Sequence, residues 1–158
     1  MNIIAEAIGE LCKVILPINE EYFLGNSDSK IAVCTLSSID LLKNFANSEI
    51  LKDISIAGRL LSENKGIDSI VEFVYKNQKT NTIIVCGKEV WGHKSGHSLF
   101  QLCRNGIDKD KRIIGSTSSD PFLSASKSKI EYFQNNVTLI DLINETNYEV
   151  VLKKIRLF

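Results

Sequence analysis

The sequence has no excess of charge of either sign, because 19 lysines and arginines balance 19 aspartates and glutamates. A chain without a net positive field has no general attraction for phosphate backbones or anionic lipid surfaces. We therefore expect it to bind neither DNA nor RNA. The short basic cluster at positions 153, 154 and 156 alternates with apolar residues, which is typical of a final strand or helix.

Long apolar runs and paired cysteines are also missing. No stretch approaches the roughly 20 consecutive apolar residues that span a bilayer. The first fifteen residues include Glu6, Glu10 and Lys13 and no small-residue cleavage site, so they do not resemble a signal peptide. The four cysteines are scattered without a C-x-x-C pair, which argues against a zinc ribbon or a redox dithiol. We expect a cytoplasmic protein with no membrane span of its own.

What the sequence does contain is typical of one globular domain. It has 158 residues, of which 44% are hydrophobic and 24% charged. Ile4, Ile8, Leu11 and Ile15 recur at helical spacing before Pro17. This pattern predicts an N-terminal helix within residues 1–20, packed on an α/β domain that covers residues 21–158.

Strand and helix signals alternate along this domain. Apolar runs predict strands at 31–36, 54–57, 82–86 and 137–143, with a short strand at 112–115. Helical spacing predicts helices from Asp68 or Ser69 to Asn77, from Gly96 to Asn105, and from Ser126 to Asn136. The alternation predicts a single Rossmann-like α/β domain with a mostly parallel sheet flanked by helices. Cys34 and Cys86 lie inside predicted strands and should be core thiols.

The unusual residues follow the clearest strand, at 82–86. Ligands of open α/β sheets bind beyond the carboxyl ends of the strands. The segment from Gly87 to His97 begins there and contains Gly92, Gly96 and both histidines of the protein, His93 and His97. Glycines let a backbone approach a large rigid ligand, although any one of them can serve only in a turn. This segment is the predicted ligand site.

The segment allows three other interpretations. Gly87 to Ser95 resembles a phosphate-binding loop, but inserted His93 displaces Lys94 and Ser95 from the positions that such a loop requires. Histidines four residues apart can share a helix face and bind zinc, yet the sequence offers no obvious third ligand. Both histidines could also be plain polar surface residues at the start of a helix.

An extended set of motifs resembles a known protein family. The motifs run from about residue 21 to residue 145, and the most specific is the string Cys86-Gly87-x-Glu89-Val90-x-Gly92-His93-x-x-Gly96. The others are Glu21-Tyr22-x-x-Gly25, Thr35-Leu36-x-Ser38, Ile56-Ala57-Gly58, Glu63-Asn64-x-Gly66-Ile67, Asn105-Gly106-Ile107-Asp108, Ile113-Ile114-Gly115, Pro121, Phe133-Gln134 and the strand near Asp141. Together they are similar to the A subunit of tetrahydromethanopterin S-methyltransferase and its stand-alone relatives.

The resemblance implies a corrinoid cofactor, cobalamin or a related molecule, and assigns residues to it. In this family the histidine of the string is the lower axial ligand of cobalt, which implies that role for His93. Neutral imidazole suits a borderline metal such as cobalt. Two roles are expected equally for Glu89: to orient this imidazole, or to be an exposed residue in a salt bridge. The cofactor contacts that the resemblance implies are Leu36, Gly58, Glu63, Gly87, Glu89, Gly92, Gly96, His97, Gly115, Ser116, Thr117, Pro121 and Phe122.

The chain departs from the family pattern at several places. His97 stands where the family usually has Gln, Arg59 where it has Pro, and Ser118-Ser119-Asp120 where it has a Gly-Ala-Ile-like stretch. The methanogen protein of this family also ends in a membrane-spanning helix, whereas this chain ends in a charged tail. These differences imply an altered cofactor rim.

The resemblance implies a methyl carrier that is not catalytic alone. Its expected partners are a second methyl acceptor and a methyl-tetrahydropterin-dependent methyltransferase subunit. Two alternatives from other classes stay open. One is a pterin- or nucleotide-binding enzyme on the same fold, and the other is a relative without a cofactor that serves as an interaction module.

Overall fold

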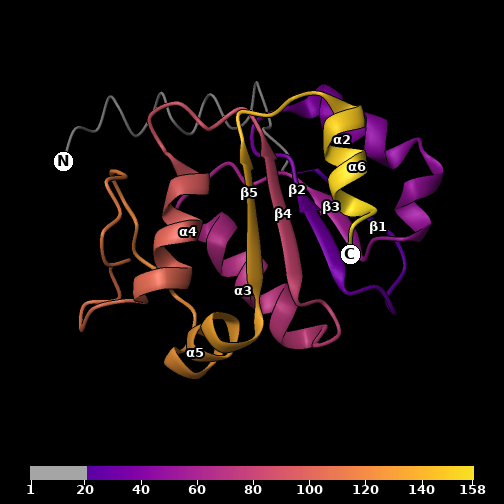
Figure 1. The fold of residues 1–158 in the computed structure, drawn as a ribbon. Coiled ribbons are helices and arrows are strands. Elements are labelled where there is room, and N and C mark those ends of the chain that lie inside the picture. The colour runs from indigo at the N-terminus through magenta and orange to yellow at the C-terminus, as the bar shows by residue number, and fades with distance from the viewer. Residues whose placement is uncertain (1–20) are drawn as a thin grey trace.

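A five-stranded sheet forms the centre of the molecule (Figure 1). The computed structural model describes residues 21–158, and the predicted N-terminal helix lies outside the described residues. Strand β1 pairs antiparallel with β3, and every other pair in the sheet is parallel. In spatial order the strands are β1 (Tyr22–Leu24), β3 (Ile56–Gly58), β2 (Ile31–Cys34), β4 (Thr82–Gly87) and β5 (Thr138–Ile143).

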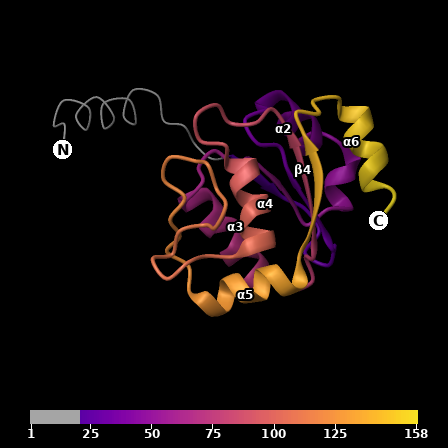
Figure 2. The ribbon, with the colours of Figure 1, turned by 60° about the vertical axis from the view of Figure 1, so that its left-hand side comes forward.

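Helices cover both faces of this sheet, and Figure 2 shows the two helical layers on opposite sides of the strands. One layer contains α3 (Lys65–Lys76), α4 (Ser95–Asn105) and α5 (Lys127–Asn136). The other contains α2 (Ile39–Ala46), the 3-10 helix η1 (Glu49–Lys52) and α6 (Tyr148–Ile155). The prediction of a single α/β domain with a mostly parallel, helix-flanked sheet is therefore confirmed.

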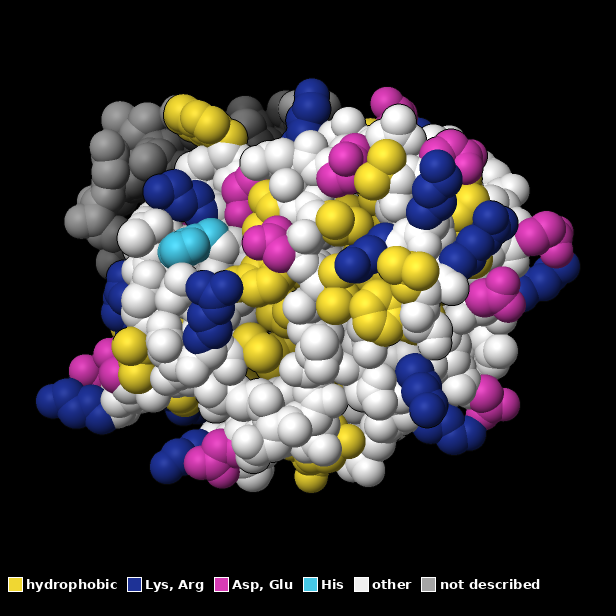
Figure 3. All heavy atoms as spheres, in the orientation of Figure 1, with side chains coloured by type: hydrophobic (Ala, Val, Ile, Leu, Met, Phe, Trp, Pro, Cys, Tyr) yellow, Lys and Arg dark blue, Asp and Glu magenta, His cyan; other side chains and the backbone are white. Residues whose placement is uncertain are grey.

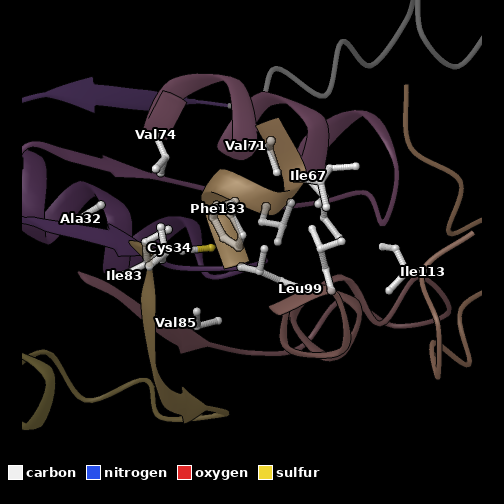
Figure 4. Packing of buried hydrophobic residues seen from close by; sticks show 14 of the residues in the cluster. Ala32, Cys34, Ile67, Val71, Val74, Ile83, Val85, Leu99, Ile113 and Phe133 are labelled. Atoms are coloured by element: carbon white, nitrogen blue, oxygen red, sulfur yellow. The ribbon is translucent and has the colours of Figure 1, made fainter. Parts of the chain in front are cut away.

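The central strand β4 shows why the sheet needs helices on both faces. Successive side chains of a strand point to opposite faces. Ile83 and Val85 join the core of the α3, α4 and α5 layer, while Ile84 and Cys86 join the core beneath α2 and α6. Figure 4 shows Val71 and Val74 of α3, Leu99 of α4 and Phe133 of α5 gathered over the strand residues Ala32, Cys34, Ile83 and Val85. Both core thiols, Cys34 and Cys86, are buried as expected.

Two predicted element boundaries are wrong. Helix α3 begins at Lys65, not at Asp68 or Ser69, because the Asn64 side chain accepts a hydrogen bond from the Lys65 amide at 2.7 Å. The Asp68 carboxylate accepts from the backbone amides of residues 124 and 125 instead. The predicted strand at 112–115 is only two isolated bridges, Ile107 with Ile113 and Arg112 with Phe122, before a turn.

The other predicted elements within residues 21–158 are present, with ends shifted by at most two residues, and Lys153 and Lys154 of the basic C-terminal cluster belong to a helix, α6. Strand β1, helix α2 and η1 had not been predicted. None of the helices between residues 21 and 158 combines the length and apolar character that crossing a membrane requires.

Candidate functional site at the carboxyl edge of the sheet

The loops that leave the carboxyl ends of β2, β4 and β5 are fastened to one another. The Ser37 hydroxyl donates to the Lys88 carbonyl at 2.7 Å, and the Lys88 amide donates to the Ser38 hydroxyl at 2.9 Å. The Glu89 amide donates to the Asn144 side chain at 3.1 Å. These hydrogen bonds between loops give the loop after β4 a fixed position, which a ligand site requires.

Two glycines of the predicted site, Gly87 and Gly92, are needed for different structural reasons. Gly87 has φ +79°, and a Cβ there would lie 2.1 Å from the Thr35 carbonyl oxygen, so this position admits no side chain. Gly92 has φ +80° but nothing within 4 Å of an added Cβ. Gly87 is therefore required by packing, whereas Gly92 serves only the tight turn that carries His93 into solvent.

His93 forms the most informative contact of this edge. Its Nδ1 lies 2.7 Å from a carboxylate oxygen of Glu63, which comes from the loop between β3 and α3. The His93 side chain is 55% exposed, and that of Glu63 is only 1% exposed. Facing a carboxylate, Nδ1 carries the proton, so the lone pair of the neutral ring resides on Nε2. Nε2 has no hydrogen-bond partner among residues 21–158 and is free to bind a ligand.

Glu63 is held in turn from the opposite side. Its second carboxylate oxygen accepts hydrogen bonds from the Ser119 hydroxyl and the Asp120 amide, both at 3.0 Å. Burial raises the pKa of the Glu63 carboxyl, but bonds from the backbone, His93 and Ser119 outweigh burial and hold this pKa below its ordinary value. Glu63 is thus an ionised, buried anchor for an exposed imidazole.

Glu89 does not orient His93, which was one of its two expected roles. Its carboxylate accepts from the backbone amides of Val90, Gly96 and His97 at 2.8, 3.0 and 2.8 Å. Two of these amides belong to the first turn of α4, where the side chain of the cap residue Lys94 forms no capping hydrogen bond. Glu89 therefore caps α4 and neutralises the positive end of its dipole.

The two histidines have different surroundings. Nε2 of His97 accepts a long hydrogen bond, 3.4 Å, from the Thr117 amide, so its lone pair faces the 115–122 loop. Within residues 21–158 no group of three His, Cys, Asp or Glu side chains is arranged to hold a metal ion. Figure 3 shows a histidine at the surface in the region of α4.

The 115–122 loop is attached to α4 by a buried serine cluster. The Ser98 hydroxyl lies 2.8 Å from that of Ser116 and 2.6 Å from that of Ser118. The loop then reaches Glu63 through its residues 119 and 120. The stretch 118–120, where the sequence departs from the family pattern, is thus the one that positions Glu63.

The remaining predicted contacts are distributed around this edge. Leu36 and Gly96 are buried against each other, with Leu36 Cδ1 3.1 Å from an added Cβ at Gly96. In the 115–122 loop, Gly115, Thr117 and Phe122 are exposed, while Ser116 and Pro121 are buried. The sequence interpretation missed Trp91, which is 96% exposed two residues before His93. The sequence shows that the only tryptophan of the chain stands two residues before the candidate ligand, and this position could have drawn attention to it.

A large hollow of the described structure lies elsewhere. It is a groove of about 900 Å³ between α3 and the strands β1, β3 and β2. We call it the α3 groove. Of the predicted contacts, only Gly58 lines it, and His93 does not. The α3 groove is therefore separate from the edge at His93.

Comparison with known proteins identifies the family. Residues 13–158 match the family of the A subunit of tetrahydromethanopterin S-methyltransferase. The chain is 36% identical over 140 residues to the A subunit of "Putative methyltransferase Mtx" of Methanosarcina barkeri, covering 88% of this chain and 67% of that protein. It is 33% identical over 137 residues to the A subunit of tetrahydromethanopterin S-methyltransferase of Methanosphaera stadtmanae, covering 85% and 53%.

A third relative is the A subunit numbered 1 of the same enzyme from Methanothermobacter thermautotrophicus, which is 31% identical over 141 residues, covering 88% of this chain and 57% of that protein. The chain thus spans between about half and two thirds of the length of these relatives. The extent of the family match confirms the resemblance that the string from Cys86 to Gly96 carries. This chain belongs to the family of the A subunit of tetrahydromethanopterin S-methyltransferase.

Proposed function

We propose that this chain binds a corrinoid at the carboxyl edge of its sheet and carries a methyl group on it. The observation that supports this proposal is the pair formed by His93 and Glu63: a buried carboxylate fixes Nδ1 of an exposed imidazole and leaves Nε2 unpaired. That arrangement fits an axial ligand of a cofactor that approaches from solvent.

The residues of this edge fit a corrinoid better than they fit a bare metal ion. A corrin ring supplies four nitrogens to its cobalt, so the protein needs to add only one axial donor. One imidazole nitrogen is what the geometry offers, and within the described residues no group of three His, Cys, Asp or Glu side chains is arranged to hold a metal ion. An open surface at His93 also suits a ring that is broad and flat.

Glu63 tunes and positions the proposed ligand. By accepting the Nδ1 proton, it selects the tautomer with its lone pair on Nε2 and raises the electron density on that nitrogen. Ser119 and the Asp120 amide prevent the carboxylate from rotating away. His93 itself lies between Gly92 and Lys94, both at positive φ, on a turn that displays the ring without burying it.

When bound, the corrinoid would supply a cobalt that takes up and gives up the methyl group. The chain would carry this group between a methyl-tetrahydropterin-dependent methyltransferase partner and a second acceptor. The names of the relatives, methyltransferase and S-methyltransferase subunits, support this role. Exposed Trp91 and Phe122 offer aromatic contacts to such a partner or to the cofactor rim.

Reconstitution with cobalamin tests the proposal. Purified protein is mixed with a slight excess of cobalamin, passed through a desalting column and examined by absorbance spectroscopy. We expect the wild type to retain cobalamin, with a spectrum that shows replacement of the cofactor's own base, and His93→Ala to lose this change. His97→Gln is the matched control and should behave like the wild type. A wild type that retains no cobalamin would contradict the proposal and favour the interaction module without a cofactor.

A further inference from the structure

The α3 groove has the shape of a binding site for a helix. One wall is a single face of α3, on which Gly66, Ile70, Phe73 and Asn77 follow one another at spacings of four, three and four. The floor is the sheet, where Leu24 of β1, Ile56 of β3 and Ala32 of β2 contribute apolar side chains. Grooves of this kind accept the apolar face of an amphipathic helix.

Most of the charges at the rim of the groove already have partners. Glu72 accepts from Lys129 at 2.6 Å and forms an ion pair with Lys76 at 3.1 Å. The Asp68 carboxylate accepts from two backbone amides of the 124–125 segment. Arg59 donates to the Ser37 carbonyl at 3.2 Å, although its buried Nε has no hydrogen-bond partner among the described residues. The apolar floor of the groove favours an apolar occupant.

We propose that the N-terminal segment, residues 1–16, occupies the α3 groove as an amphipathic helix. Its Ile4, Ile8, Leu11 and Ile15 fall within one narrow stripe at 3.6 residues per turn. The charged residues of the segment, Glu6, Glu10 and Lys13, fall on the opposite side of the same helix and would face solvent.

The lengths of the stripe and of the groove wall agree. Ile4 and Ile15 are as far apart in sequence as Gly66 and Asn77, and at 1.5 Å per residue each interval spans about 16 Å. The chain also enters at the right place, because Glu21 and Tyr22 themselves line the groove. The four residues 17–20 can bridge up to about 14 Å between the end of this helix and Glu21.

The entry point also sets the direction of the helix. Tyr22 pairs with Gly58, so β1 begins at the carboxyl end of β3, the end from which α3 also departs. A short connection then places Ile15 near Ile70, close to the start of α3, and Ile4 near Ile56, at the amino end of β3. The N-terminal helix runs antiparallel to α3.

Methyl NMR of the full chain tests this placement. In protein with ¹³C-labelled Ile and Leu methyl groups, we expect nuclear Overhauser contacts from Ile15 to Ile70 and from Ile4 to Ile56. An isotope-filtered experiment on a mixture of labelled and unlabelled protein should show none of them, because the contacts lie within one molecule. Contacts seen only between copies would mean that a second copy fills the groove, and would overturn the proposal.

A matched pair of variants supplies a second readout. Leu11→Lys and Glu10→Gln both change the charge by one unit in the same direction, but only the first removes a residue from the apolar stripe. Hydrogen exchange measures the effect of each change. Compared with the wild type, the amides of residues 4–15 should exchange at least about tenfold faster in Leu11→Lys and at the same rate in Glu10→Gln. Equal exchange in the wild type and Leu11→Lys, together with an absence of contacts to Ile70 and Ile56, would leave the groove to a partner protein and contradict our assignment.

Discussion

The edge at His93 and the α3 groove differ in what each could receive. At the edge, hydrogen bonds hold three loops and a buried carboxylate around one exposed imidazole. The groove has a volume of about 900 Å³ and an apolar floor, and most of its described charges are paired. In our proposal the chemistry lies at the edge and not in this large hollow, since a broad flat ligand needs a surface and a donor.

The largest effect is expected at Gly87, which belongs to the rigid frame of the edge. Gly87→Ala would place a Cβ 2.1 Å from a backbone oxygen at positive φ, and we expect a loss of about 3–5 kcal/mol of unfolding free energy. Gly92→Ala, at the same φ but in open space, should cost only about 1 kcal/mol. Urea denaturation of both variants measures the difference, and equal losses would show that the edge is not close-packed at Gly87.

The next largest effect separates the two acids of the edge. Glu63→Ala removes a buried carboxylate and with it the acceptor of the Ser119 hydroxyl, the Asp120 amide and the His93 ring, and should cost about 2–3 kcal/mol. Glu89→Ala removes a helix cap that is partly exposed, and should cost about 1–2 kcal/mol. In the cobalamin spectrum, however, only the Glu63 variant should alter the ligand signal, because Glu89 does not touch His93. If Glu89→Ala altered the ligand signal and Glu63→Ala did not, Glu89 and not Glu63 would be the residue that positions His93.

A smaller effect is expected from acid. The pKa of Glu63 is lowered in the folded chain, so its ionised form contributes stability above the ordinary value of 4.5, and this contribution disappears as the pH falls through the lowered folded pKa. Urea denaturation of the wild type and Glu63→Gln without cofactor should show a constant difference near neutral pH that shrinks below about pH 4.5. A difference that grows on acidification would mean that Glu63 is protonated in the folded state.

Local sequence patterns were sufficient to predict the longer strands and three of the helices. Strand β4 was found because Ile83, Ile84 and Val85 form an unbroken apolar run, and α4 because its end is marked by Gly106 at positive φ. Helix α2 was missed although Leu41, Leu42 and Phe45 carry helical spacing. Strand β1 offers only three exposed residues, too few for alternation to identify a strand.

The sequence predicted where the candidate site lies, but not which residues are hydrogen-bonded to each other there. The segment from Gly87 to His97 could be located because its glycines and histidines follow the clearest strand. The partner of His93 could not be inferred from proximity, because Glu63 lies 30 residues away and comes close only when the β3–α3 loop folds beside the 115–122 loop. The nearer acid, Glu89, was the natural guess and was wrong. The α3 groove was missed for the same reason, since its walls come from separate segments.

The most direct test of our central claim is electron paramagnetic resonance of the protein reconstituted with cobalamin and reduced to Co(II). One coordinated nitrogen splits the cobalt lines, and labelling with ¹⁵N-histidine separates a protein imidazole from the cofactor's own base. We expect the splitting to respond to the label in the wild type and in His97→Gln, and not to respond to it in His93→Ala, where any nitrogen on cobalt comes from the cofactor's own base. A wild-type splitting that does not respond to the label, or a label-dependent splitting that survives in His93→Ala, would contradict the assignment of His93 as the axial ligand.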